Sequence, residues 1–172
     1  MGTVYWITGL SGAGKTTIGK LLYQKMREMY PNTVFLDGDI LRKVFGDDLG
    51  STKEERRKCA MRYARICAML QEQGLNVICC TISMFDSVRD WNRKNIRNYK
   101  EIYIKVTMDT LRERDQKGLY SGLTQEKQKD VVGIHMDVEE PKHPDVIIEN
   151  DGEWMPEQQA ERILHLIKEA KR

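Results

Sequence analysis

The sequence has no strong excess of charge and no long apolar segment. Its 172 residues include 28 basic and 26 acidic side chains, which gives a net charge of +2. A dedicated nucleic-acid-binding protein usually carries a clear basic excess, so this balance argues against that class. Apolar runs stay shorter than the roughly 18 residues that cross a bilayer, so we expect no association with a membrane.

Cysteine is scarce and is not arranged for disulfides or metal. The four cysteines form no Cys-x-x-Cys pair, and Cys79 and Cys80 are adjacent. Neighbours on a strand point to opposite faces, so these two thiols are poor disulfide partners. No cluster of His and Cys has the spacing of a metal site. We therefore expect reduced thiols and a cytoplasmic protein.

Apolar segments of strand length alternate with amphipathic segments of helix length. The expected strands cover residues 3–9, 33–39, 75–82, 101–106 and 144–150. The expected helices cover residues 15–30, 40–45, 53–73, 85–96, a short stretch around 111, and 156–170. This alternation predicts an α/β fold with a five-stranded parallel sheet and helices on both faces. We expect one domain over residues 1–172, with a mobile lid over the polar residues 116–130.

Residues 9–17, GLSGAGKTT, match the pattern G-x-x-x-x-G-K-[ST] between a predicted strand and a predicted helix. Glycines let successive backbone N–H groups face phosphate oxygens, and the helix start adds positive potential. In this motif Lys15 reaches the β- and γ-phosphates and the Thr16 hydroxyl binds Mg²⁺. Arg114 borders the predicted lid, where cations can close over phosphates. The predicted ATP-binding residues are Gly9, Leu10, Ser11, Gly12, Ala13, Gly14, Lys15, Thr16, Thr17 and Arg114.

Two classes of phosphate-loop protein lack support in the sequence. A GTP switch usually carries an N-K-x-D motif, but residues 92–95 read NRKN and lack the acid. A motor ATPase usually ends a strand beside the phosphate loop in Asp or Asp-Glu. Here the third predicted strand is followed by Thr81, Ile82 and Ser83. The remaining class is a kinase that passes the phosphate to a small molecule.

The second predicted strand instead ends in two acids, Asp37 and Asp39. The carboxyl ends of parallel strands open onto the ligand crevice, so both acids should lie near the phosphate loop. One carboxylate can orient or deprotonate an acceptor hydroxyl, and the other can hold magnesium. Alternatively, Asp39 caps a helix over residues 40–45, which is compatible with catalysis. We predict Lys15, Asp37 and Asp39 as catalytic and Thr16 and Asp39 as magnesium ligands, without deciding which aspartate is the base.

Taken together, the motifs resemble the adenylyl-sulfate (APS) kinase family over nearly the whole chain. The matching segments are GLSGAGKTT, LDGD at 36–39 with Arg42, DLG at 48–50, Ile82-Ser83, RD-x-KGLY at 114–120, Gly133-Ile134 and Pro141. The resemblance implies transfer of the γ-phosphate of ATP to the ribose 3′-hydroxyl of a nucleotide with a modified 5′ end, with Mg²⁺ as cofactor. It also suggests that the protein forms a homodimer. The molecule that it acts on would be a small nucleotide acceptor.

The resemblance also identifies the acceptor side of the site. Arg42 and Arg56 match family arginines that hold the anionic part of the acceptor, as guanidinium geometry favours. Ser83 matches a serine near the acceptor, although a strand-end serine that bonds the backbone explains it equally well. The implied acceptor-binding residues are Asp37, Arg42, Ser51, Arg56, Cys59, Ile82, Ser83, Lys117 and Val131.

The departures from the family pattern also lie on the acceptor side. Ser51 and Val131 stand where the family has two aromatic rings around the acceptor adenine, and Cys59 replaces an asparagine. Stacking on a ring contributes on the order of 1–3 kcal/mol per base. We therefore expect the chemistry to be kept and the acceptor to differ, with cytidine diphosphoramidate a candidate beside adenylyl sulfate. A different small-molecule kinase and a non-catalytic nucleotide-binding module remain alternatives.

Overall fold

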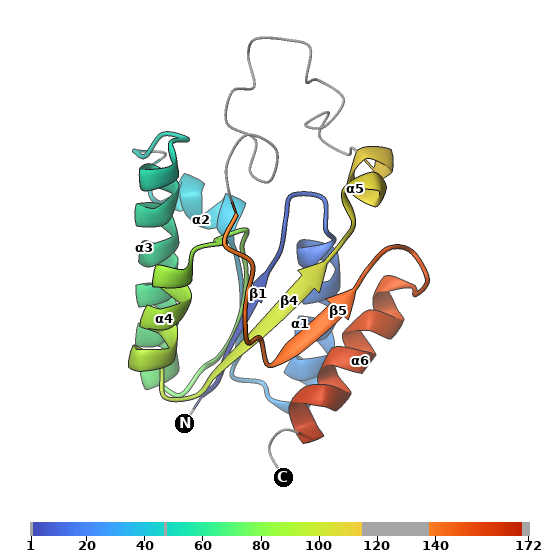
Figure 1. The fold of residues 1–172 in the computed structure, drawn as a ribbon. Coiled ribbons are helices and arrows are strands. Elements are labelled where there is room, and N and C mark those ends of the chain that lie inside the picture. Colours follow the sequence, from blue (N-terminus) through green and yellow to red (C-terminus); the bar gives the residue numbers. More distant parts are fainter. Residues whose placement is uncertain (1, 47, 115–137, 170–172) are drawn as a thin grey trace.

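The structure is a computed structural model that describes residues 2–46, 48–114 and 138–169 (Figure 1). Strands and helices alternate along these residues, as the sequence predicts. The strands are β1 (Val4–Thr8), β2 (Thr33–Asp37), β3 (Asn76–Cys80), β4 (Tyr99–Lys105) and β5 (Val146–Glu149). The helices are α1 (Lys15–Met29), α2 (Gly38–Val44), α3 (Lys53–Glu72), α4 (Asp86–Asn95), α5 (Met108–Arg114) and α6 (Pro156–Glu169). The predicted lid, residues 116–130, lies outside the described residues.

The strands form one parallel sheet in the order β2-β3-β1-β4-β5. This confirms the predicted fold class. Because every strand runs the same way, the segments that follow β1, β2 and β3 emerge at one edge of the sheet. The phosphate loop, the paired aspartates and Ser83 therefore meet in space although up to 74 residues separate them along the chain, as the bond from Thr8 to the Ile82 carbonyl illustrates.

Helices cover both faces of the sheet, so β1 is buried along its whole length. Tyr5 and Ile7 face the core beneath α1 and α6, whereas Val4 and Trp6 face the core beneath α3 and α4 (Figure 1). This two-sided burial explains why the strand is a continuous apolar run rather than an alternating one. No helix among the described residues is long and apolar enough to span a membrane.

The start of α2 differs from the sequence prediction. The helix begins at Gly38, and its N-cap is Asp37 rather than Asp39. Asp37 has extended backbone angles, and its Oδ1 accepts hydrogen bonds from the backbone N–H groups of Asp39 (2.9 Å) and Ile40 (3.3 Å). A carboxylate at this position satisfies N–H groups that have no partner inside the helix. Asp37 thus has a structural contact in addition to any chemical role.

Candidate active site

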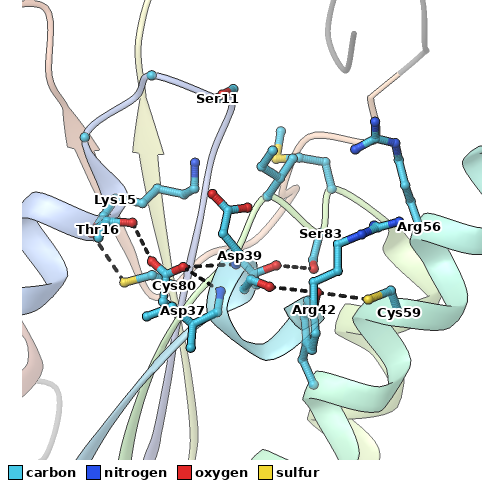
Figure 2. A pocket seen from close by; sticks show the side chains of 18 of the residues that line it. Ser11, Lys15, Thr16, Asp37, Asp39, Arg42, Arg56, Cys59, Cys80 and Ser83 are labelled. Carbon is cyan, nitrogen blue, oxygen red and sulfur yellow. Dashed lines mark hydrogen bonds between the residues drawn. The ribbon is translucent and has the colours of Figure 1, made fainter. Parts of the chain in front are cut away.

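A cavity of about 450 Å³ opens at the carboxyl ends of the central strands. Its walls come from the phosphate loop, the β2–α2 junction, the start of α3 and the segment after β3 (Figure 2). The predicted residues that line it are Ser11, Gly12, Gly14, Lys15, Thr16, Thr17, Asp37, Asp39, Arg42, Arg56, Cys59, Ile82 and Ser83. The structure thus brings the predicted donor and acceptor residues to one place.

Several predicted residues stand apart from the cavity wall. Within the described chain, the lining residues do not include Gly9, Leu10, Ala13, Ser51 or Arg114. The first three belong to the phosphate loop, in which the Leu10 carbonyl oxygen accepts a hydrogen bond from Lys15 Nζ at 2.6 Å. Lys117 and Val131, both predicted on the acceptor side, lie outside the described residues.

Glycine is required at two turns of the phosphate loop. Gly14 has a φ of +92°, and a Cβ there would lie 2.7 Å from Asn150 Nδ2. At Gly9, where φ is +155°, a Cβ would lie 2.4 Å from the carbonyl oxygen of Ile104. Residues with a side chain rarely adopt such angles, and neither position leaves room for a Cβ atom. The two glycines therefore fix the path of the loop around the cavity.

Asn150 supports the phosphate loop from behind, and the sequence analysis missed it. This buried side chain donates from Nδ2 to the Ala13 carbonyl oxygen at 2.9 Å. Arg114 donates to the carbonyl oxygen of Asn150 at 2.6 Å. Arg114 is therefore connected to the loop through Asn150. No local pattern marks Asn150, because its partner is 137 residues away in the chain.

Thr16 and Asp37 form the central contact of the site. The Thr16 hydroxyl donates to Asp37 Oδ2 at 2.7 Å, while Oδ1 of the same carboxylate caps α2. Asp37 is 9% exposed, whereas Asp39 is exposed. Figure 2 shows Lys15 and Asp39 extending into the same cavity. Two carboxylates, one hydroxyl and one ammonium group therefore converge where a triphosphate would enter.

These oxygen donors fit magnesium. Mg²⁺ prefers hard oxygen ligands and is usually held by one or two carboxylates together with substrate phosphates and water. Thr16, Asp37 and Asp39 supply donors of that kind at the cavity. The described residues contain no group of three or more His, Cys, Asp or Glu side chains able to hold a metal by themselves. A metal that needs phosphate to complete its shell suits this arrangement better than a permanently bound one.

The two predicted acceptor arginines also organise the chain around the cavity. Arg42 donates to the carbonyl oxygens of Leu49 and Gly50, and Arg56 Nε donates to the Ser51 carbonyl at 2.7 Å. Both guanidinium groups lie on the opposite side of the cavity from Thr16 (Figure 2). They therefore tie residues 49–51 to α2 and α3 at the acceptor end.

Tyr63, which the sequence analysis also missed, joins α3 to the aspartate turn. Cys59 Sγ lies 2.9 Å from the Tyr63 hydroxyl, which donates to the Gly38 carbonyl oxygen at 2.9 Å. Burial raises the pKa of Tyr63, so the phenol keeps its proton for this bond. The ring also stacks on Phe45, with centroids 5.9 Å apart. Cys59 and Tyr63 are one helical turn apart, the only sequence signal for their pairing.

Ser83 is held in an unusual backbone conformation at the cavity. It is the one described non-glycine residue with positive φ, at +28°. Its hydroxyl lies 2.6 Å from Thr81 Oγ1 and is buried. Such backbone strain persists only where surrounding contacts enforce it. The contact with Thr81 is to a side chain and not the backbone bond that the structural alternative expects. Ser83 lies on the cavity wall, and its acceptor role stays a prediction.

Comparison with known proteins extends these observations. The family model for adenylylsulphate kinase matches residues 1–149. Cytidine diphosphoramidate kinase of Campylobacter jejuni is 40% identical over 161 residues, which cover 94% of each chain. A probable adenylyl-sulfate kinase of Archaeoglobus fulgidus is 34% identical over 88% of this chain and 97% of its own. Among solved structures, the APS kinase of Mycobacterium tuberculosis in complex with AMPPNP and APS gives a TM-score of 0.89 at 27% identity, covering 97% of this chain and 98% of that one.

Proposed function

The chain belongs to the adenylylsulphate kinase family of nucleotide kinases, and on that basis we propose that it transfers the γ-phosphate of ATP to the ribose 3′-hydroxyl of a nucleotide with a modified 5′ end. The observation that carries this proposal is the hydrogen bond from Thr16 to Asp37 at 2.7 Å, with Asp39 and Lys15 on the same cavity. Phosphoryl transfer depends chiefly on positioning and on neutralising charge, which these groups provide.

The contacts favour a division of labour between the two aspartates. Asp37 accepts the hydrogen bond from the Thr16 hydroxyl, so the lone pairs of the Thr16 oxygen are directed away from Asp37 toward the cavity. Thr16 then serves as the magnesium ligand, with Asp37 fixing its orientation. This leaves Asp39 to face the acceptor. The sequence analysis placed Asp39 among the magnesium ligands and Asp37 among the acceptor-binding residues and did not decide which aspartate is the base. The present proposal assigns the base to Asp39.

In the transfer step, the acceptor oxygen bonds to the γ-phosphorus while the bond from that phosphorus to the β,γ-bridging oxygen breaks. ADP leaves with the bridging oxygen, and the 3′-hydroxyl proton passes to Asp39. Lys15 and the backbone N–H groups of the phosphate loop hold the β- and γ-phosphates in line. Thr16 would hold Mg²⁺ at the cavity, where the ion would supply positive charge that offsets the charge of the phosphates.

We propose cytidine diphosphoramidate as the first acceptor to test, with adenylyl sulfate as its rival. Two findings support this order. Cytidine diphosphoramidate kinase aligns at 40% identity over 94% of the chain. In addition, Ser51 and Val131 provide no ring to stack against an adenine. Loss of two stacking contacts of roughly 1–3 kcal/mol each would weaken adenine binding strongly, whereas the transfer groups are all present.

The test is a panel of acceptors under saturating ATP and Mg²⁺. Cytidine diphosphoramidate, adenylyl sulfate, CDP and shikimate are incubated with the enzyme, ADP release is coupled to NADH oxidation, and ³¹P NMR identifies the phosphorylated hydroxyl. We expect 3′-phosphorylated cytidine diphosphoramidate, with a kcat/KM at least tenfold above that for adenylyl sulfate. Phosphorylation of a non-nucleotide alone, or no transfer to any acceptor, would overturn the proposal.

A further inference from the structure

Lys53 is a cation in a position that helix stability does not explain. It is the first residue of α3, directly after the N-cap Thr52, whose side chain and that of Glu55 form a capping box. The positive end of a helix dipole disfavours a cation in the first turn, where acids are preferred. Lys53 nevertheless stands there, with its side chain about half exposed on the cavity wall.

Glu139 holds this lysine beside the cavity. Glu139 Oε1 lies 3.7 Å from Lys53 Nζ, and Oε2 accepts a hydrogen bond from the backbone N–H of Asp86 at 2.6 Å. The glutamate backbone is fixed as well, because its N–H donates to the Met84 carbonyl at 3.2 Å and its carbonyl accepts from the buried Arg89. The carboxylate thus has a defined place between α3 and the start of α4.

The contact with Glu139 leaves the lysine able to bind an anion. A distance of 3.7 Å is within ion-pair range but too long for a hydrogen bond, so it orients the ammonium without consuming its donors. Arg42 and Arg56, the other acceptor-side cations, donate to backbone carbonyls of residues 49–51. The position of Lys53, by comparison, is supported by its ion pair with the Glu139 side chain.

We propose that Lys53 binds the anionic 5′ group of the acceptor nucleotide and that Glu139 is the positioning residue that keeps its ammonium group at the cavity. This inference rests on the proposed function, because it assigns the substrate's negative charge within that site. A 5′-diphosphate derivative, with more than one anionic oxygen, is the ligand class that three cations on one wall suit. Lys53 acts on acceptor binding and not on ATP, since the phosphate loop lies across the cavity.

The test compares Lys53→Met, Lys53→Arg and Glu139→Gln with the wild type, using the nucleotide acceptor that the wild type phosphorylates fastest. We expect Lys53→Met to raise the acceptor KM about five- to twentyfold, the range for one partly exposed charge-assisted contact. The KM for ATP should stay within twofold and kcat should change little. Lys53→Arg should restore most of the affinity, and Glu139→Gln should raise the acceptor KM about two- to fivefold.

Lys58→Met is the matched control, since Lys58 is an exposed lysine on the same helix that does not line the cavity. Its acceptor KM should equal that of the wild type. Salt should weaken acceptor binding less in Lys53→Met than in the wild type, because one fewer charge is screened.

Calorimetric binding of CDP to AMPPNP-saturated protein repeats the comparison without turnover. If the wild type is active and Lys53→Met leaves both the acceptor KM and the CDP affinity unchanged, the inference about Lys53 is overturned while the proposed function stands. A wild type that phosphorylates no nucleotide would instead overturn the proposed function.

Discussion

Replacing Asp37 by asparagine or alanine separates its structural contact from its chemical one. The carboxylate accepts three hydrogen bonds, two from the start of α2 and one from Thr16. Asparagine caps a helix about as well as aspartate, so one amide oxygen can keep both backbone bonds. Its NH₂ group would then face the Thr16 hydroxyl and occupy the lone pair that should serve the metal. Alanine removes all three bonds.

The two variants should therefore differ in stability and agree in activity. Asp37→Ala loses the cap, which costs about 0.5–2 kcal/mol of unfolding free energy, while Asp37→Asn should lose less than half as much. Both should lower kcat about 100-fold or more, equivalent to about 2.7 kcal/mol of transition-state stabilisation. Urea unfolding measures the first quantity, and ADP release at saturating ATP and acceptor measures the second.

Asp109→Asn is the control for loss of a carboxylate, because the Asp109 side chain is 90% exposed on α5, where it forms a surface ion pair with Arg112. It should leave both turnover and stability within experimental error. The reasoning is refuted if Asp37→Asn keeps more than half of the wild-type kcat. It is also refuted if Asp37→Asn and Asp37→Ala are equally unstable, because the cap would then contribute nothing.

Three further predictions concern the loop support, the surface charges and the thiols. Asn150→Ala leaves the Ala13 carbonyl without its bond, so we expect a loss of about 1–3 kcal/mol in unfolding free energy and a several-fold rise in the ATP KM; an unchanged ATP KM would show that Asn150 does not support the loop. A hydrogen bond from Lys142 lowers the pKa of Asp86 below its ordinary 3.8, so its stabilisation is full above that value and is lost as pH falls through the lower folded value. The stability gap between wild type and Asp86→Asn in urea should shrink below about pH 4, and a gap that is constant from pH 7 to pH 2 would contradict this. All four cysteines are buried and unpaired by disulfides, and burial raises the pKa of Cys80, so DTNB should react only after unfolding; rapid reaction of the native protein would be the opposite result.

The sequence predicted most of the fold because its signals are local. A strand such as β1 is apolar on both faces, since it is covered on both sides, and a glycine loop and a helix follow it directly. The start of α2 could not be predicted in the same way. Asp37 and Asp39 are equally good capping residues, and only the extended backbone of Asp37 decides between them.

The candidate site was predictable where its residues are contiguous in a motif. Asn150, Tyr63, Glu139 and Lys53 were missed because each depends on a partner in another element. Glu139, for example, contacts a backbone N–H that is 53 residues earlier in the chain. Nothing near Glu139 in the sequence marks that partner, and two consecutive glutamates, Glu139 and Glu140, are ordinary in a surface loop.

These long-range contacts explain how the phosphate loop can be ready before a nucleotide arrives. The left-handed backbone of Gly14 would be one of many states of an isolated glycine-rich segment. In the folded chain, Asn150 holds the neighbouring Ala13 carbonyl, and the Lys15 ammonium bonds to the Leu10 carbonyl across the loop. A ligand then finds the N–H groups already oriented, and binding does not have to supply the free energy that orders the loop. Because Asn150 lies at the end of β5, the edge strand of the sheet helps to position the donor phosphate although it contributes no residue to the cavity wall.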